Sequence, residues 1–591
     1  MSNYSINNIY QGGYSSLKPQ YGDIFTGYRI NPGTLGITTD PRTANIVQEA
    51  TSKLNMGVKQ IELALVSPEV FDSIPRQSLK EIERLSKLTG IDVSVHGPVM
   101  DSTGISQQGF SELNREAEER KIREVLLRSN KVNSKGNVNV TFHSAEGIQG
   151  SEWKTLGEDR KAKRIIAIDK ETGKMTNLEE ERKFYPGEDL SKPKLYSPEE
   201  NLRMQNESLW DNQINQLFFN KERADEILTQ NAVQIQHLMD YINDKAKKNE
   251  KPALVPAQEE AYLKFKDASN YLGEVHKNAN GIFSKAYEYG TDEQKKLLEE
   301  VNKEYKEDLE KNGKDIMGQS RAMHNLLINL QRPELAPQMF VPIEEFAVQQ
   351  SSKTFGNAAF EAYKKLGDKA PILTIENPPV GFALSTGEDL KNLIVESRKK
   401  FAENAMKEKG ISHSEANKLA EKFIGATWDV GHINMLRKQG FEGKDVVAES
   451  EKIAPFVKHV HLSDNFGYEH TELPMGMGNV PLNEVMKKLG QKGFEAKKIV
   501  EAGNWWQYFA EKGGGNPFKP SMEGMSSPIY SMGPSAYWSQ PPALGSYYMG
   551  HGAINTPTHH RLYGAGFENL PVELGGEIPG DRGRFGGSPN Q

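Results

Sequence analysis

Residues that commonly bind metal ions stand at the ends of six short apolar segments of this chain. The segments are Ile91-Asp-Val-Ser-Val-His96, Val138-Asn-Val-Thr-Phe-His143, Pro371-Ile-Leu-Thr-Ile-Glu376, Ile424-Gly-Ala-Thr-Trp-Asp429, Phe456-Val-Lys-His-Val-His461 and Lys497-Lys-Ile-Val-Glu501. Short apolar strands normally end in turn residues instead. Imidazoles and carboxylates together suit Zn²⁺ or Mn²⁺ better than Ca²⁺. The pattern therefore predicts a divalent metal site.

Three further candidate ligands follow these segments closely. His432 lies three residues after Asp429, and His470 and Glu472 lie in the loop after His461. Side chains two residues apart in an extended loop point to the same side, so His470 and Glu472 could both reach one ion.

Two more polar residues belong to the last of these regions. Asp464, just beyond His461, is predicted either to orient a ligand imidazole or to cap the next helix. His459 has the same strand parity as His461, so it lines the barrel, and we expect it to fill the core.

The elements that must position these residues alternate strand and helix. Strands near residues 28–37 and 60–65 bring the number of predicted strands to about eight, and helical segments separate them. Such alternation predicts parallel strands joined by right-handed crossovers. We therefore predict an α/β fold, a (β/α)₈ TIM barrel. Because parallel barrel strands all end on one face, the six strand-end residues should converge on one pocket there.

Changes of composition divide the chain further. We predict a flexible N-terminal arm (1–27), a first barrel half (28–146), an α-helical insertion after the fourth strand (147–334), a second barrel half (335–512) and a Gly/Pro/Tyr-rich tail (513–591). Both ends are expected to be disordered, because such compositions cannot bury enough apolar surface. The insertion leaves from the face of the predicted site, and we hypothesise that it forms a lid or an oligomer contact; the tail is a second candidate for contact between subunits.

The bulk composition excludes several kinds of chemistry. The chain has no cysteine, which removes disulfides, thiolate metal sites and cysteine nucleophiles. Charged residues make up 26% of the 591 residues and the net charge is −7, so no global basic field attracts nucleic acid. No signal-peptide core and no membrane-length apolar stretch is present, so we expect no membrane partner and a cytoplasmic protein.

The order of these motifs resembles the xylose isomerase-like TIM barrel superfamily. The resemblance rests on Ser94-Val-His96-Gly-Pro98, Phe142-His143, Ile375-Glu376-Asn377, Asp429-Val-Gly-His432, His459-Val-His461-Leu-Ser-Asp464-Asn, Leu473-Pro-Met-Gly-Met-Gly478-Asn and Val500-Glu501. It covers residues 28–145 and 335–510, without the insertion or either terminal segment. The superfamily includes endonuclease IV, which acts on DNA with abasic sites in DNA repair, and many sugar isomerases and epimerases.

The endonuclease branch resembles this chain through a site for three zinc ions. The resemblance implies that one ion is held by His96, His143 and Glu376, a second by Glu376, Asp429, His461 and Glu501, and a third by His432, His470 and Glu472. Glu376 would bridge the first two ions. The third-ion loop of that branch usually runs Asp-x-His, so imidazole and carboxylate are exchanged here. The four residues that follow His96 are Gly97, Pro98, Val99 and Met100, and they include no aromatic side chain or arginine to prise a nucleotide from DNA.

The isomerase branch resembles the chain through Glu376, Asp429, His461 and Glu501 alone. In that branch one Mn²⁺ or Mg²⁺ ion binds the sugar oxygens, and two glutamates, here Glu376 and Glu501, move the proton. We rank a metal-dependent phosphodiester hydrolase first, with abasic DNA as substrate. A sugar or sugar-phosphate isomerase or epimerase comes second, and a non-catalytic assembly protein built on a retained barrel comes third.

Overall fold

The computed structural model describes residues 35–502, apart from short gaps at 56–57, 107–108, 134, 146, 158, 188 and 314. The predicted arm at 1–27 and the tail at 513–591 lie outside the described residues. The described chain divides into two compact units. One consists of the residues up to Lys161 and from Ile343 onward, and the other spans Ala162–Pro342. Among the described residues no helix is both long enough and apolar enough to cross a membrane.

The first unit contains the predicted closed barrel. Its eight parallel strands are β1 (Leu35–Thr38), β2 (Gln60–Ala64), β3 (Asp92–His96), β6 (Asn139–His143), β13 (Ile372–Glu376), β14 (Ile424–Asp429), β15 (Val457–Leu462) and β16 (Lys497–Val500). Pairing of Leu35 with Lys498 and of Ile37 with Val500 joins the last strand to the first. The (β/α)₈ prediction is confirmed, and the carboxyl ends of all these strands lie on one face.

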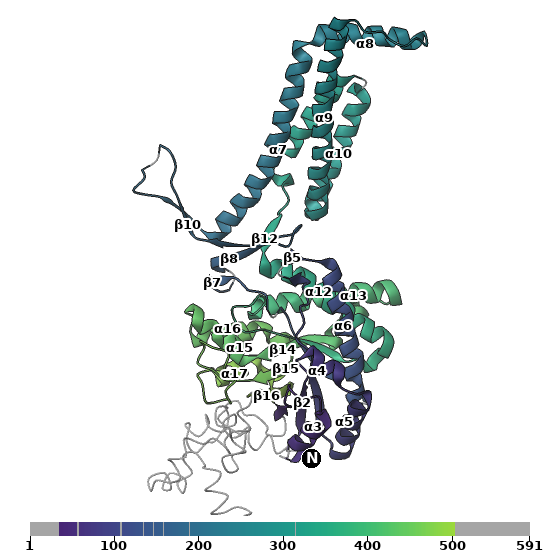
Figure 1. Ribbon diagram of the computed structural model, residues 1–591. Helices are drawn as coiled ribbons and strands as arrows, with labels where there is room; N and C mark the ends of the chain where they lie inside the picture. The colour runs from purple at the N-terminus through teal and green to yellow at the C-terminus, as the bar shows by residue number, and fades with distance from the viewer. Residues whose placement is uncertain are drawn as a thin grey trace, which may run out of the picture. The chain divides into compact units, whose positions relative to one another are not determined.

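Helices surround the barrel in the order that the alternation predicted (Figure 1). They are α3 (Ile46–Asn55), α4 (Pro68–Ser73), α5 (Arg76–Thr89), α6 (Glu112–Ser129), α12 (Ile343–Leu366), α13 (Gly387–Lys409), α14 (His413–Phe423), α15 (Val430–Asn434), α16 (Gly443–Ile453) and α17 (Leu482–Glu495). A short hairpin of β4 (Ile105–Ser106) and β5 (Gly109–Phe110) follows β3, and β7 (Glu152–Thr155) follows β6.

Strand parity separates the outer core of the barrel from its interior. Leu63, Val95, Phe142, Ile375 and Trp428 occupy alternate positions with outward parity and are buried. The indole N–H of Trp428 donates to Ser450 Oγ in α16 at 3.0 Å, which fixes that helix against β14. The residues at the other alternate positions, which include the strand-end residues, point into the barrel. Toward the carboxyl ends of the strands these inward residues are mostly polar.

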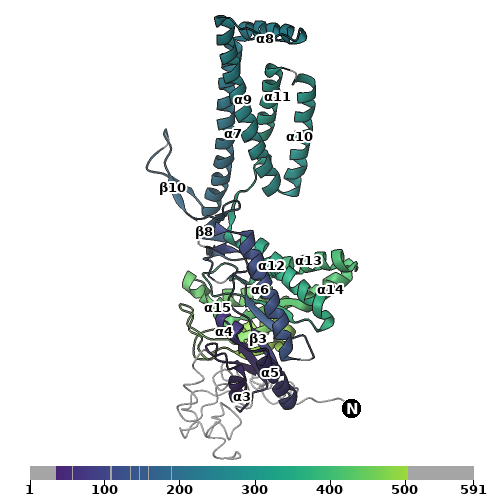
Figure 2. The same ribbon diagram turned by 45° about the vertical axis from the view of Figure 1, so that its right-hand side comes forward.

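The second unit is a bundle of long helices attached to a small sheet. The helices are α7 (Pro198–Gln230), α8 (Ala232–Lys247), α9 (Pro256–Tyr289), α10 (Asp292–Asn312) and α11 (Ile316–Leu330). Within this unit α7, α9 and α10 run side by side in Figure 1, and Figure 2 shows α11 next to α10. Their shared core includes Trp210, Leu217, Val275, Leu298 and Leu327.

The insertion begins with strands, which the sequence analysis missed. Before α7 come β8 (Lys161–Asp169), β9 (Met175–Glu179), β10 (Glu181–Lys183) and β11 (Lys194–Tyr196), and β12 (Phe340–Pro342) follows the bundle. β8 pairs antiparallel with both β9 and β12. The run Arg164-Ile-Ile-Ala-Ile168 supplies the β-branched residues for this sheet. The compact unit of residues 162–342 therefore begins and ends later than the predicted 147–334.

Candidate metal centre

The six strand-end residues converge at the carboxyl face of the barrel, as predicted. Four of them are the last residues of β3, β6, β13 and β14. His461 is the last but one residue of β15, and Glu501 directly follows β16. Their side chains share the inward parity of Ser94, Thr141, Thr374, Thr427 and His459, the residues two positions earlier on the same strands. His96, Glu376, Asp429 and His461 are buried, whereas His143 and Glu501 are half-buried. The barrel thus presents imidazoles and carboxylates to a common space.

The first group consists of His96, His143 and Glu376. Glu376 Oε2 lies 3.1 Å from His96 Nε2 and 3.4 Å from His143 Nε2. His96 Nδ1 donates to the carbonyl oxygen of Gly97 at 3.0 Å, so Nδ1 carries the hydrogen. The other ring nitrogen, Nε2, faces Glu376 Oε2 and is the atom that would bind a cation there.

The second group is formed by Glu376, Asp429, His461 and Glu501. His461 Nδ1 lies 2.8 Å from Glu376 Oε1 and 3.0 Å from Glu501 Oε2. One ligand atom from each of the four residues lies within 4.8 Å of the others, as is also true of the first group. Glu376 therefore directs one carboxylate oxygen toward each group, which is the placement of a bridging ligand.

Asp429 is held in place by the start of α15. Its Oδ1 accepts hydrogen bonds from the backbone N–H groups of Gly431 and His432, both at 2.7 Å, and from Ser463 Oγ at 3.1 Å. The carboxylate thus caps the helix that carries His432. The spacing of three residues between Asp429 and His432 follows from this cap.

The third predicted ligand set is only partly assembled. His432 Nδ1 donates to the carbonyl oxygen of Asn377 at 2.7 Å, and His432 Nε2 lies 2.8 Å from His470 Nε2. Glu472 Oε1 lies 3.8 Å from His470 Nε2. Among the described residues, these three do not form a group whose ligand atoms all lie within 4.8 Å of one another. His470 and Glu472 lie on a loop and are each 37% exposed, so regular secondary structure does not hold them as it holds the strand-end residues.

The pKa values of the cluster show that it attracts positive charge. Burial alone would raise the pKa of Glu376, but the neighbouring His461 and His143 hold it well below its usual range. The pKa of Glu501 is lowered to about 2 by His461 despite its burial. Burial lowers the pKa of His96, but the Glu376 carboxylate raises it to about 9. The pKa of Asp429, by contrast, is raised by its burial and by Glu501 and Glu376. Glu376 and Glu501 are thus stabilised in their ionised forms by positive charge beside them, and a divalent ion could also supply such charge.

Asp464 does not contact a ligand imidazole through its carboxylate, and it does not cap the following helix. Its oxygens accept four backbone N–H groups, from Asn465, Gly476, Gly478 and Val480, at 2.8–3.1 Å. Neither predicted contact is among the hydrogen bonds that this carboxylate makes with the described residues. The reason is the path of the loop over residues 465–480, which folds back over the carboxylate and carries His470 and Glu472.

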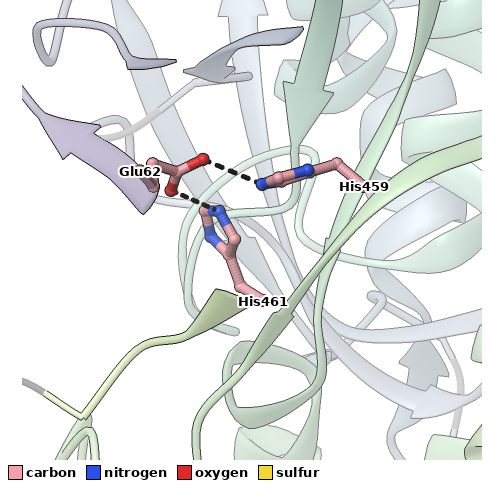
Figure 3. A group of neighbouring side chains, drawn as sticks. All are labelled: Glu62, His459 and His461. Carbon is pink, nitrogen blue, oxygen red and sulfur yellow. Dashed lines mark hydrogen bonds and ion pairs between the residues drawn. The ribbon is translucent and has the colours of Figure 1, made fainter. Parts of the chain in front are cut away.

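Sequence reasoning missed Glu62, which belongs to the interior of this site. It lies in the middle of β2, and its carboxylate faces His459 and His461 (Figure 3). His459 is fully buried in the barrel, where it contacts Glu62. A lone carboxylate at an inward position of the apolar run Gln60-Ile-Glu-Leu-Ala64 was the available signal.

Comparisons with known proteins agree with this fold. The family described as xylose isomerase-like TIM barrel matches residues 381–515. An uncharacterized protein of Methanocaldococcus jannaschii is 32% identical over 83 residues, which are 14% of this chain; the chain spans only 27% of the length of that relative. The resemblance to xylose isomerase-like barrels is thus confirmed. This superfamily contains enzymes of several kinds.

Two solved structures of sugar epimerases show a weak likeness to the chain. A D-tagatose 3-epimerase-like protein has a TM-score of 0.35 at 13% identity, covering 81% of this chain and 94% of its own. The D-psicose 3-epimerase of Clostridium cellulolyticum, solved with D-tagatose, has a TM-score of 0.33 at 8% identity, covering 84% of this chain and 96% of its own.

Proposed function

We propose that this protein is a metal-dependent hydrolase of phosphodiester bonds, similar to endonuclease IV. The observation that carries the proposal is the position of Glu376, whose two oxygens face two different ligand groups. A single-ion isomerase needs no ligands at His96 and His143, yet both imidazoles point their Nε2 atoms at Glu376 Oε2. A centre with more than one ion explains why both are present.

The residues suit zinc, because imidazole nitrogens and carboxylate oxygens are its ordinary ligands. His96, His143 and Glu376 would hold one ion, and Glu376, Asp429, His461 and Glu501 a second. His432, His470 and Glu472 would complete a third site after a small movement of the loop that carries His470 and Glu472. When bound, such ions lower the pKa of a water molecule and offset negative charge on a phosphodiester.

For the substrate we propose DNA with an abasic site. The loop after β15 carries Phe466 and Tyr468, which are 56% and 65% exposed. Exposed aromatic rings on the loop that carries His470 can stack on a base or a sugar. The four residues directly after β3, Gly97 to Met100, include no aromatic ring, so the proposed contacts with the nucleic acid would come from the second half of the barrel.

Isomerisation or epimerisation of a sugar or sugar phosphate is the second candidate. The observation that favours it is the closure of Glu376, Asp429, His461 and Glu501 into one group without help from the loop. One Mn²⁺ or Mg²⁺ ion at this group would leave Glu376 and Glu501 to move a proton between sugar carbons. In this case His143 would be dispensable for metal binding.

Metal analysis of His143→Ala separates the two candidates. The wild-type protein should contain about three zinc ions per chain, one for each ligand set. The variant should lose the ion of the first group and the ability to nick a duplex that carries an abasic-site analogue. His413→Ala, at an exposed histidine of α14, is the matched control and should keep both properties.

Other results would reject the hydrolase. A wild-type protein with a single ion that His143→Ala retains would favour the isomerase, which a screen of ketose and aldose sugars would then test. Full metal content without turnover on any of these substrates would favour a non-catalytic role, with the insertion or the tail as the contact surface of an oligomer.

A further inference from the structure

A layer of buried polar residues lies in the barrel interior, directly beneath the candidate metal centre. It includes Glu62 on β2, Ser94 on β3 and His459 on β15, and all three are at most 2% exposed. Register places Glu62 opposite Ser94, and Ala64 opposite His96. Glu62 is therefore two residues deeper in the barrel than the strand-end ligands. Burying a carboxylate is costly unless several partners satisfy it.

Both oxygens of Glu62 are engaged. Oε2 accepts a hydrogen bond from Ser94 Oγ at 2.8 Å and another from His459 Nε2 at 2.8 Å. Oε1 lies 2.9 Å from His461 Nε2 (Figure 3). The contact is an ion pair by distance; both atoms are buried, and neither has a hydrogen-bond partner among the described residues.

The ring of His461 therefore spans two carboxylate environments. Its Nδ1 faces Glu376 and Glu501 at the metal centre, and its Nε2 faces Glu62. An imidazole that binds a metal through one nitrogen carries its hydrogen on the other, and a carboxylate beside that hydrogen fixes both the tautomer and the ring orientation. Glu62 is the carboxylate beside that nitrogen, with Oε1 at 2.9 Å from Nε2.

We infer that Glu62 is a positioning residue for the metal centre: held by Ser94 and His459, it keeps His461 oriented with Nδ1 toward the ions. The inference rests on the proposed metal centre. It assigns a role to a buried glutamate that none of the three ligand sets uses, and it explains why His459, two residues before a ligand, is also an imidazole.

Glu62, His459 and His461 are close enough together to hold an ion of their own. The contacts of Oε2 argue against this arrangement. A carboxylate oxygen has two lone-pair directions, and Ser94 and His459 already donate to Oε2 at ordinary hydrogen-bond distances. An ion there would have to displace at least one of these donors. The two hydrogen bonds to Oε2 and the ion pair at Oε1 account for the geometry without such a change.

The test compares Glu62→Gln with Glu344→Gln in the full-length protein. Glu344 is also a buried glutamate; it accepts hydrogen bonds from Ser151 and lies outside the ligand groups. Each protein is stripped of metal and titrated with Co²⁺ and with Zn²⁺ against a competing chelator, and the visible spectrum of the Co²⁺ form is recorded. Glu62→Gln should weaken metal binding by about 10–100-fold and change the Co²⁺ spectrum, as is typical when a carboxylate behind a ligand histidine is lost. The number of ions at saturation should stay unchanged, and Glu344→Gln should resemble wild type.

Ser94→Ala is the second variant, for use if Glu62→Gln does not fold, because it keeps the negative charge of Glu62. It removes one donor that orients Glu62, and a smaller loss of affinity in the same direction is expected. Wild-type affinity and spectrum in both variants would overturn the inference, as would an equal effect in Glu344→Gln. Loss of one whole ion on substitution of Glu62 would show that the group binds metal itself. A wild-type protein that binds neither metal would instead refute the metal centre, and the positioning role with it.

Discussion

Replacing Asp464 by Asn tests how the loop that carries His470 and Glu472 is held. Asp464 Oδ1 accepts the N–H groups of Asn465 and Val480, and Oδ2 accepts those of Gly476 and Gly478. An asparagine side chain offers one acceptor oxygen in place of two. In either orientation of the amide, two backbone donors therefore face an NH₂ group.

The cost follows from this count of donors. Gly476 is exposed and Gly478 is half-buried, so water can reach their donors, and each lost hydrogen bond should cost about 0.5–1.5 kcal/mol, or about 1–3 kcal/mol for the two. All four donors lie within residues 465–480, so the penalty is relieved by opening this loop, not by unfolding the barrel. Because 1.4 kcal/mol is a factor of ten, opening should become easier by about 5-fold or more.

Hydrogen exchange followed by mass spectrometry measures this opening. Peptides over residues 464–480 should exchange faster in Asp464→Asn, while peptides from α13 should be unchanged. Asp101→Asn is the matched control, because both donors of Thr103 are directed at Oδ1 of Asp101, an oxygen that asparagine keeps. Wild-type exchange over 464–480 in Asp464→Asn, or equal acceleration across the whole barrel, would refute the reasoning.

Three further predictions concern the barrel. Removing metal with a chelator should lower the free energy of unfolding by about 4 kcal/mol, compared with the protein in zinc at about a thousand times its Kd, because the ions bind only the folded carboxylate cluster. A melting temperature that does not change with chelator would contradict this. Gly97→Ala should cost about 1–3 kcal/mol in denaturant unfolding, since its Cβ would lie 2.5 Å from the ring of Phe142; unchanged stability would show that the ring moves freely. Burial and the nearby Asp389 raise the pKa of Glu344, so ionisation opposes folding as pH rises through that pKa. Glu344→Gln should therefore match wild type in acid and become the more stable protein as pH increases. If denaturant unfolding gave the same stability difference between the two proteins in acid and at neutral pH, the raised pKa of Glu344 would be disproved.

Much of the candidate site could be predicted because strand geometry is local. Side chains alternate across a strand whatever its neighbours are, and parallel barrel strands end on one face. The positions of His96, Glu376 and His461 at strand ends therefore implied their convergence. The structure also places the oxygens of Glu376 toward two groups, an arrangement that follows from the register of β13 with β6 and β14.

The loops and the insertion depend on contacts that the sequence pattern does not reveal. Asp464 accepts N–H groups from residues up to sixteen positions away, so its role depends on the path of the loop and not on its neighbours in the chain. Antiparallel pairing between β8 and β12 joins segments separated by the whole helical bundle. A charged, helix-rich composition around these strands concealed them.

The sequence by itself determined the barrel, its approximate number of strands and the six candidate ligands at their ends, because apolar alternation and strand direction are properties of short segments. Only the tertiary structure decided that Glu62 stands behind His461, and that His432, His470 and Glu472 are not drawn into one group. The physical reason is barrel closure. β2 and β15 do not pair with each other, and only the closed barrel brings the mid-strand carboxylate of Glu62 to His461 Nε2 across the interior. The spacing of residues along the chain does not encode the distance between two strands that are not neighbours.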